Sequence, residues 1–191
     1  MTHPSPAVRR WTRMEYERLV DLGLFRGDAV ELIGGHLVVA EPQGSYHATA
    51  VGAADDALRA VLPPNFIVRA QMPVALDDES APEPDLAVVP GARGDYRDAH
   101  PARPALIVEV ADSSLELDRA HKGSLYARAG VQDYWIVNLI DRTVEVHRDP
   151  GPDPSAPYGW RYRSMQTLAP PARVALLALP AAQICVADLL P

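Results

Sequence analysis

The sequence of 191 residues has very little cysteine and no long apolar segment. Its single cysteine, Cys185, excludes an internal disulfide and a metal cage built of cysteines alone. A proline, a glutamine and an aspartate interrupt the most apolar stretch, Val174–Leu190, so no run reaches the roughly 18 apolar residues of a membrane helix. Residues 1–12 lack the apolar core of a signal peptide. We therefore expect a cytoplasmic, soluble protein with no membrane partner.

Positive charge is scarce as well. The chain has 25 acidic and 18 basic residues, a formal net charge of −7, so its overall field repels polyanions and any nucleic-acid binding has to be local. Of the basic residues 17 are arginine and only Lys122 is lysine. Such a bias indicates a coding preference that replaced interchangeable lysines. Lys122 is then either a chance survivor or a position where a planar guanidinium cannot replace a compact ammonium.

The remaining composition is that of an ordinary globular protein, with 48% hydrophobic and 23% charged residues. A chain of this length is long enough to bury a core and suits one domain. The 19 prolines mark many strand ends and loops. We expect residues 1–10 to form a flexible tail and residues 11–191 to form a single domain.

Local patterns predict an alternation of helices and strands. Thr12 and Glu15 form a capping box that begins a helix ending near Gly23. Gly34-Gly35 separates two short apolar runs and predicts a hairpin. A second helix, capped by Ser45, ends at residue 62, and a third runs from Ser113 or Ser114 to the residue before Gly130. Further strands are predicted over residues 66–76, 85–89, 105–111, 133–140, 143–148 and 158–168, with a proline-rich linker at 149–157.

The order of these elements, αββαβββαββ followed by the strand over residues 158–168, mixes hairpins with helices. It predicts an α/β (α+β) domain with a central mixed β-sheet flanked by helices. The apolar C-terminal segment is expected to close the core and to end in a short helix.

Two acidic residues accompany neighbouring apolar strands. Glu109 is the only polar residue of A-L-I-V-E-V-A at 105–111, and a carboxylate in such a strand must be paired, protonated or bound to a metal. A buried arginine is one possible partner. Asp85 follows Pro84 at the start of another strand, where an acid is often only a solvated turn residue. If both lie on one face of the sheet, the two carboxylates form a pair that suits Mg²⁺.

A third group follows on the next predicted helix. Asp118, Lys122 and Tyr126 are spaced by four residues and line one helical face. The structural alternative is an ordinary surface ion pair between Asp118 and Lys122.

The order of these residues resembles a known family. The motifs are Pro84-Asp85, Glu109-Val110, Asp118, Lys122 and the following Y-A-R-A-G-V-Q-D-Y-W-I-V. Over roughly Trp11–Arg148 the chain resembles the PD-(D/E)XK nuclease superfamily, in particular its Uma-type branch of bacterial restriction endonuclease-like proteins. The superfamily's lysine normally lies two residues after the acid, where this chain has Ala111. In the Uma-type branch the lysine lies on the next helix, which matches Lys122.

The resemblance implies a restriction endonuclease-like core and a Mg²⁺-dependent endonuclease that hydrolyses phosphodiester bonds in DNA, as a homodimer. It implies that Asp85, Glu109 and the main-chain carbonyl of Val110 bind Mg²⁺, with Mn²⁺ as a substitute. Asp85, Glu109 and Lys122 are then the catalytic residues. Auxiliary roles are implied for Glu31, His47, Gln71, Asp118 and Tyr126.

Several alternatives stay open at this point. His47 would in a structural role bond a main-chain carbonyl, and Glu31 would pair with an arginine. The whole chain could be a non-catalytic nucleic-acid-binding or protein-interaction domain that retains the nuclease fold, which the net charge and Ala111 favour. Metal-assisted hydrolysis of a small phosphoester is a third reading.

Overall fold

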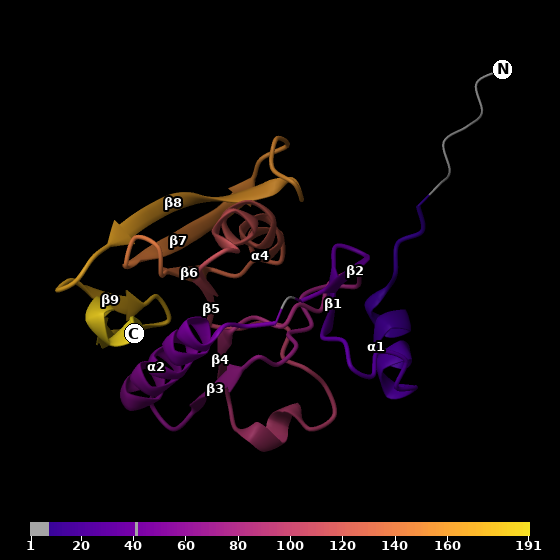
Figure 1. Ribbon diagram of the computed structural model, residues 1–191, viewed down its shortest axis with the longest axis horizontal. Helices are drawn as coiled ribbons and strands as arrows, with labels where there is room; N and C mark the ends of the chain where they lie inside the picture. The colour runs from indigo at the N-terminus through magenta and orange to yellow at the C-terminus, as the bar shows by residue number, and fades with distance from the viewer. Residues whose placement is uncertain (1–7, 41) are drawn as a thin grey trace.

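The computed structural model describes residues 8–40 and 42–191. Its centre is a six-stranded sheet in the order β3-β4-β5-β6-β7-β8 (Figure 1). The strands are β3 (Phe66–Ala70), β4 (Leu86–Pro90), β5 (Leu106–Ala111), β6 (Asp133–Asn138), β7 (Thr143–Pro152) and β8 (Trp160–Leu168). Only β5 and β6 pair in parallel, and the other neighbours are antiparallel. The predicted mixed sheet is therefore confirmed.

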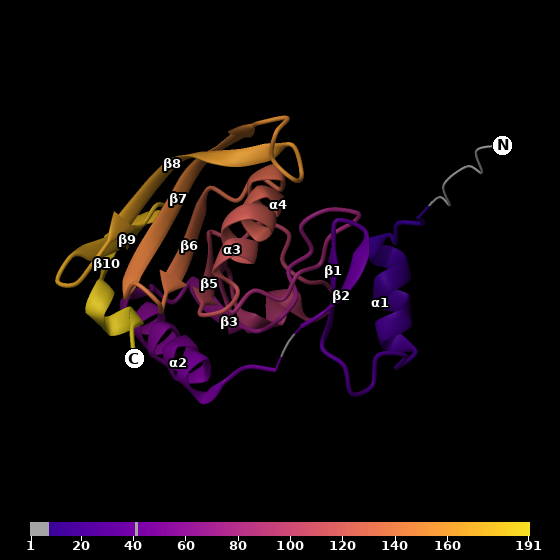
Figure 2. The same cartoon turned by 45° about the horizontal axis from the view of Figure 1, so that its top comes forward.

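Helices and a C-terminal hairpin cover the two faces of this sheet. One face packs against α2 (Ser45–Val61), β9 (Arg173–Leu176), β10 (Leu179–Cys185) and the 3₁₀ turn η3 (Val186–Leu189). The other packs against α3 (Leu115–Leu117), the π-helical turn η2 (Asp118–Lys122) and α4 (Gly123–Arg128). Figure 2 shows α2 and α4 on opposite sides of the sheet.

Strand β5 contributes to both layers because successive side chains point to opposite faces. Val108 and Val110 belong to the apolar core under α2, whereas Ile107 and Ala111 belong to the core under α4. By this alternation Glu109 points to the α4 side. The polar residue that interrupts the strand is thus directed towards the helix that carries Lys122.

An N-terminal unit of α1 (Arg13–Asp21), β1 (Val30–Ile33) and β2 (His36–Val39) lies beside the sheet (Figures 1 and 2). The predicted capping box of Thr12 and Glu15 is present. Gly34 and Gly35 have φ of 55° and 80°, as the predicted two-residue turn requires. A bridge from Leu32 to residue 81 attaches the unit to the loop that leads into β4.

One predicted helix start is wrong, because Ser45 is the first residue of α2 and Gly44 is its cap. The helix predicted from Ser113 or Ser114 has Ser114 as its cap and ends at Arg128, before Gly130, as predicted. It is interrupted by η2, a π-helical turn that the local pattern does not predict.

Two strand ends lie four or more residues from their predicted positions. Strand β3 ends at Ala70 because Gln71 adopts a left-handed φ of 51°. Strand β7 continues through part of the predicted linker, to Pro152, because Pro150 and Pro152 still pair with β8. The strand has passed the end of β6 there, so a proline without an N–H is tolerated.

The predicted tail falls mostly on residues 1–7, which lie outside the described residues. Of the helices in the part of the chain that the structure describes, none is long and apolar enough to cross a membrane.

Candidate active site

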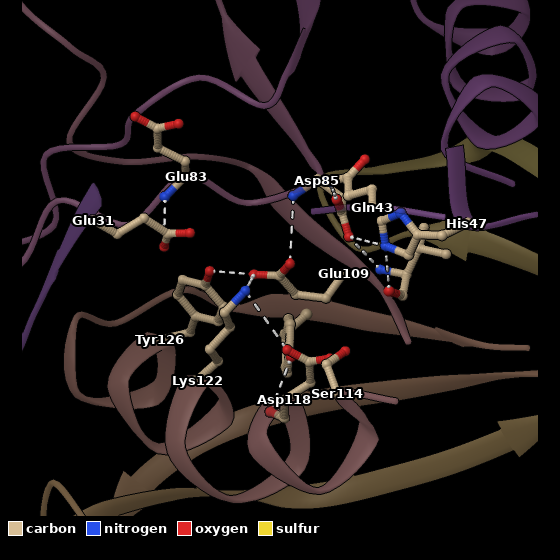
Figure 3. Close-up of polar contacts among 12 residues, drawn as sticks. Glu31, Gln43, His47, Glu83, Asp85, Glu109, Ser114, Asp118, Lys122 and Tyr126 are labelled. Carbon is tan, nitrogen blue, oxygen red and sulfur yellow. Dashed lines mark hydrogen bonds and ion pairs between the residues drawn. The ribbon is translucent and has the colours of Figure 1, made fainter. Parts of the chain in front are cut away.

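Strand pairing brings the two predicted acids together. Asp85 directly precedes β4, and Leu86 is paired with Val108 of β5. The N–H of Asp85 points at Glu109 Oε2 over 3.4 Å, and the N–H of Val110 donates to Asp85 Oδ2 over 2.8 Å (Figure 3). Both carboxyl groups are buried, with residue exposures of 7% and 2%. Backbone N–H groups therefore fix the orientation of both side chains.

Lys122 extends from the turn η2 to the carboxylate of Glu109. Its Nζ lies 3.1 Å from Glu109 Oε1 and 3.7 Å from Asp118 Oδ1. The hydroxyl of Tyr126 donates to Glu109 Oε1 over 2.5 Å. Asp118 is only 1% exposed, so its pair with Lys122 is not a surface ion pair. The partner of Glu109 is a lysine, and the alternative of a buried arginine is wrong.

His47 approaches from the α2 side of the sheet. Its Nε2 lies 2.8 Å from the carbonyl oxygen of Val110 and 3.3 Å from Asp85 Oδ2. The hydrogen bond to Asp85 raises the pKa of His47. His47 thus bonds a main-chain carbonyl, as expected if its role is structural. That carbonyl is also the one predicted to bind metal.

Gln43 is a site residue that the sequence does not reveal. Its Nε2 donates to Asp85 Oδ1 over 3.3 Å. The residue stands in the connection before α2 and belongs to no motif, so only the folded structure indicates it. Gln71, by contrast, was predicted as an auxiliary residue, but it is exposed and reaches the site only through its backbone N–H, which donates to the carbonyl of Asp85 over 3.0 Å.

Glu31 reaches the site from β1 of the N-terminal unit (Figure 3). Its Oε2 accepts a hydrogen bond from the N–H of Glu83 over 3.1 Å, and it pairs with no arginine among the described residues. Burial raises the pKa of Glu31, while Lys122 opposes the shift. Burial and the Glu31 carboxylate together raise the pKa of Glu83. The N-terminal unit therefore adds negative charge to the cluster.

Carboxyl groups outnumber the ammonium group in this cluster. Among the described residues, the buried carboxyl groups of Glu31, Glu109 and Asp118 act on the charge of Lys122. Asp85 adds a fourth buried carboxyl group next to Glu109. Burial raises the pKa of Glu109 to about 8 and also raises that of Asp118, with Lys122 opposing both shifts.

Lys122 itself keeps its proton. Burial lowers its pKa, but the carboxylates of Glu109, Asp118 and Glu31 outweigh that effect, and the pKa is raised. Without a further cation, Glu109 holds a proton at neutral pH, which limits the buried charge.

The donor atoms suit a hard divalent cation. Within residues 8–40 and 42–191, no three His, Cys, Asp or Glu side chains are arranged as a metal centre. The predicted set instead consists of two carboxylates and a backbone carbonyl, an oxygen-only set of the kind that Mg²⁺ takes together with waters and phosphates. His47 Nε2 lies 2.8 Å from the Val110 carbonyl oxygen, whose second lone pair is left for a cation.

The structure combines a mixed sheet, an Asp and a Glu at two adjacent strands, and a Lys on the following helix. This combination places the protein in the class of nuclease-like folds. The chain belongs to the Uma2 family, described as "Putative restriction endonuclease", which matches residues 14–187. The predicted family is thus confirmed.

The fold is also found among solved structures. The crystal structure of "a putative nuclease belonging to DUF820" from Anabaena variabilis ATCC 29413 is similar, with a TM-score of 0.67 and 19% sequence identity over 93% of this chain and 96% of that one. No curated protein matches the chain. This likeness shows that the two chains share a fold, in agreement with the predicted central mixed sheet flanked by helices.

Proposed function

We propose that this protein is a Mg²⁺-dependent endonuclease that hydrolyses phosphodiester bonds in DNA. Asp85, Glu109 and the carbonyl of Val110 hold the metal, and Mn²⁺ substitutes for Mg²⁺. The observation that carries the proposal is the excess of buried carboxyl groups over the single ammonium. Such an arrangement costs stability unless a cation is bound, and a site kept at that cost is typical of function. Membership of the Uma2 family supports the reaction class.

The metal, when bound, lowers the pKa of a water molecule and neutralises charge on the phosphate. The chain's own groups prepare the ligands. Val110 N–H and Gln43 Nε2 fix the two oxygens of Asp85, and the Tyr126 hydroxyl and the Asp85 N–H fix the two oxygens of Glu109. Ligands held by such supporting contacts need little reorganisation when they bind.

Lys122 supplies the positive charge. Its ammonium stays protonated next to Glu109, in a site where water is largely excluded. A fixed charge of this kind stabilises the negative charge that develops on a scissile phosphate. In this role Lys122 takes the place of the strand lysine, whose position is Ala111.

Thermal unfolding with and without metal tests the site. Mg²⁺ or Mn²⁺ should stabilise the wild type by about 2.7 kcal/mol at a hundredfold excess over Kd, and Asp85→Ala should abolish the effect. Asp98→Ala is the matched control, because Asp98 is an exposed aspartate paired with Arg97 on the surface. An equal stabilisation of Asp85→Ala and Asp98→Ala would refute the metal site.

Cleavage assays test the substrate. Nicking of supercoiled plasmid DNA, dependent on Mg²⁺ or Mn²⁺, is expected for an endonuclease. Hydrolysis of a small phosphodiester without plasmid cleavage would support the small-phosphoester alternative. Metal binding without hydrolysis of either substrate would support a non-catalytic domain, the alternative that the net charge of −7 favours. The homodimer stays a prediction, which light scattering on the purified protein checks.

A further inference from the structure

The helix that carries Lys122 is interrupted at that residue by the turn η2. The N–H of Gly123 reaches the carbonyl of Asp118, five residues earlier, where a regular α-helix would bond four residues back. Single π-helical turns are rare and often occur at functional sites. This turn spans the segment from Asp118 to Lys122, and the Lys122 ammonium lies between Asp118 and Glu109.

The π turn reduces the angle around the helix axis between Asp118 and Tyr126. In an uninterrupted α-helix, Tyr126 would lie about 80° around the axis from Asp118. A π turn absorbs one additional residue and turns the following segment back by about 100°, which leaves an offset of about 20°. Lys122 and Tyr126 consequently converge on Glu109 Oε1, at 3.1 and 2.5 Å, and Asp118 lies 3.7 Å from the Lys122 ammonium.

Two residues stabilise the turn η2, one on β6 and one directly after the turn. The buried hydroxyl of Tyr134, on β6, donates to the carbonyl of Asp118 over 3.0 Å. Gly123 closes the turn in a tight space, where an added Cβ would lie 3.2 Å from that carbonyl oxygen and 3.6 Å from Cε1 of Tyr134. Ser114 Oγ in turn holds the Asp118 side chain, at 2.6 Å from Oδ2.

We propose that the π turn is the device that places the Lys122 ammonium at Glu109, and that Tyr134 and Gly123 are its positioning residues. A chain with Ala111 on the strand needs such a device, because its lysine has to reach the site from the helix. Tyr134 acts through the Asp118 carbonyl and makes no hydrogen bond to Glu109 among the described residues. The catalytic consequence rests on the proposed nuclease function, but the placement of Lys122 does not.

The sequence offers a direct readout of this placement. Lys122 is the only lysine, so protein labelled with ¹³C-lysine shows one ε-methylene NMR signal. In the wild type this signal should carry the shift of a buried group beside aromatic rings. It reports on Lys122 whether or not the protein cleaves DNA.

The test compares Tyr134→Phe with Tyr162→Phe. The two rings are stacked 5.8 Å apart, and the Tyr162 hydroxyl also donates to a backbone carbonyl, that of Val131, over 2.8 Å. Both variants therefore lose one equivalent hydrogen bond. Tyr134→Phe should move the Lys122 signal and reduce plasmid cleavage roughly ten- to hundredfold, as misplacement by about 1 Å does. Tyr162→Phe should leave both unchanged.

Gly123→Ala and Gly52→Ala form a second pair. Gly52 lies within α2, and a Cβ there would meet nothing within 4 Å. Gly123→Ala should move the Lys122 signal, whereas Gly52→Ala should not. If Tyr134→Phe leaves the Lys122 signal as it is in Tyr162→Phe, the proposal is overturned. If the wild type never cleaves but the signal moves as expected, the nuclease function fails and the positioning role stands.

Discussion

Buried acids occur in two regions of this sheet, and the two are neutralised differently. On strands β6 and β7 the partners are arginines. Asp133, at the start of β6 and fully buried, accepts hydrogen bonds from Arg148 Nε at 2.7 Å and from Trp135 Nε1 at 2.9 Å. The N–H of Leu177 donates to its other oxygen over 2.7 Å. Asp133 thus has several donors of its own.

Glu145 on β7 follows the same principle. Its carboxylate accepts two hydrogen bonds from Arg119, at 3.0 and 2.5 Å, and one from Asn138 Nδ2, at 3.1 Å. Despite burial, these donors lower the pKa of Glu145. A planar guanidinium that binds both oxygens is the strongest partner for a carboxylate.

The candidate site contrasts with both. Glu109 and Asp118 share the ammonium of Lys122, and their pKa values are raised. A chain with 17 arginines could have supplied guanidinium groups here as it did for Asp133 and Glu145. The difference indicates that the arginine pairs of β6 and β7 serve stability, whereas the cluster around Glu109 is arranged for a further cation and for chemistry.

The largest effect should come from breaking an arginine pair. Arg148→Met leaves the Asp133 carboxylate buried without its charged partner, which should lower the free energy of unfolding by about 3–5 kcal/mol. Urea denaturation measures the loss. Arg97→Met is the control, since the Arg97–Asp98 pair is exposed and worth at most about 1 kcal/mol. Equal losses in the two variants would contradict the distinction.

Exchanging the two kinds of cation should separate activity from stability. Lys122→Arg should reduce plasmid cleavage by about a hundredfold or more, because a larger, planar group cannot occupy the place of the ammonium. The stabilisation by metal should be retained. Arg148→Lys, the reverse exchange at Asp133, should lower the melting temperature and leave cleavage intact. Wild-type cleavage by Lys122→Arg would show that Lys122 survived by chance.

The pH dependence of stability should differ as well. In the folded, metal-free protein Glu109 has a pKa of about 8 against an ordinary value of 4.5, so it binds its proton more tightly when folded. Its contribution is complete below about pH 4.5 and is lost as the pH rises through about 8. With a chelator present, Glu109→Gln should therefore lose less stability than the wild type as the pH rises from about 5 to about 9, a range that covers the ordinary and the raised pKa of Glu109.

Urea denaturation at several pH values in EDTA measures this slope. Glu116→Gln, which changes an exposed glutamate of α3, should retain the slope of the wild type. If the slope of Glu109→Gln equals that of Glu116→Gln, Glu109 does not hold the proton in the metal-free site.

The smallest effect is expected at Ser114. Ser114→Ala removes the hydroxyl that donates to Asp118 Oδ2 over 2.6 Å, and one such bond contributes about 1 kcal/mol. Ser155→Ala removes a comparable bond to Asp153 in an exposed loop, where water replaces it. Thermal unfolding should show the larger decrease for Ser114→Ala, and the opposite order would show that Asp118 does not depend on this donor.

Much of this architecture could be predicted from the sequence because the signals are local. The Thr12 capping box, the Gly34-Gly35 turn and the apolar strands depend on neighbouring residues, and each is found in the structure. Asp85 and Glu109 were noticeable because each interrupts or begins an apolar strand. Lys122 was noticeable because it is the only lysine.

Only the tertiary structure decided how these residues meet. The position of His47 on the Val110 carbonyl, and of Gln43 on Asp85, depends on how α2 packs on the sheet. The π turn depends on a hydroxyl from β6, Tyr134, sixteen residues after Asp118. Hydrogen bonds between distant segments leave no periodic pattern in the sequence. The sequence alone therefore determined the strands and the candidate acids. Packing between the layers determined the partners and the charge of these acids.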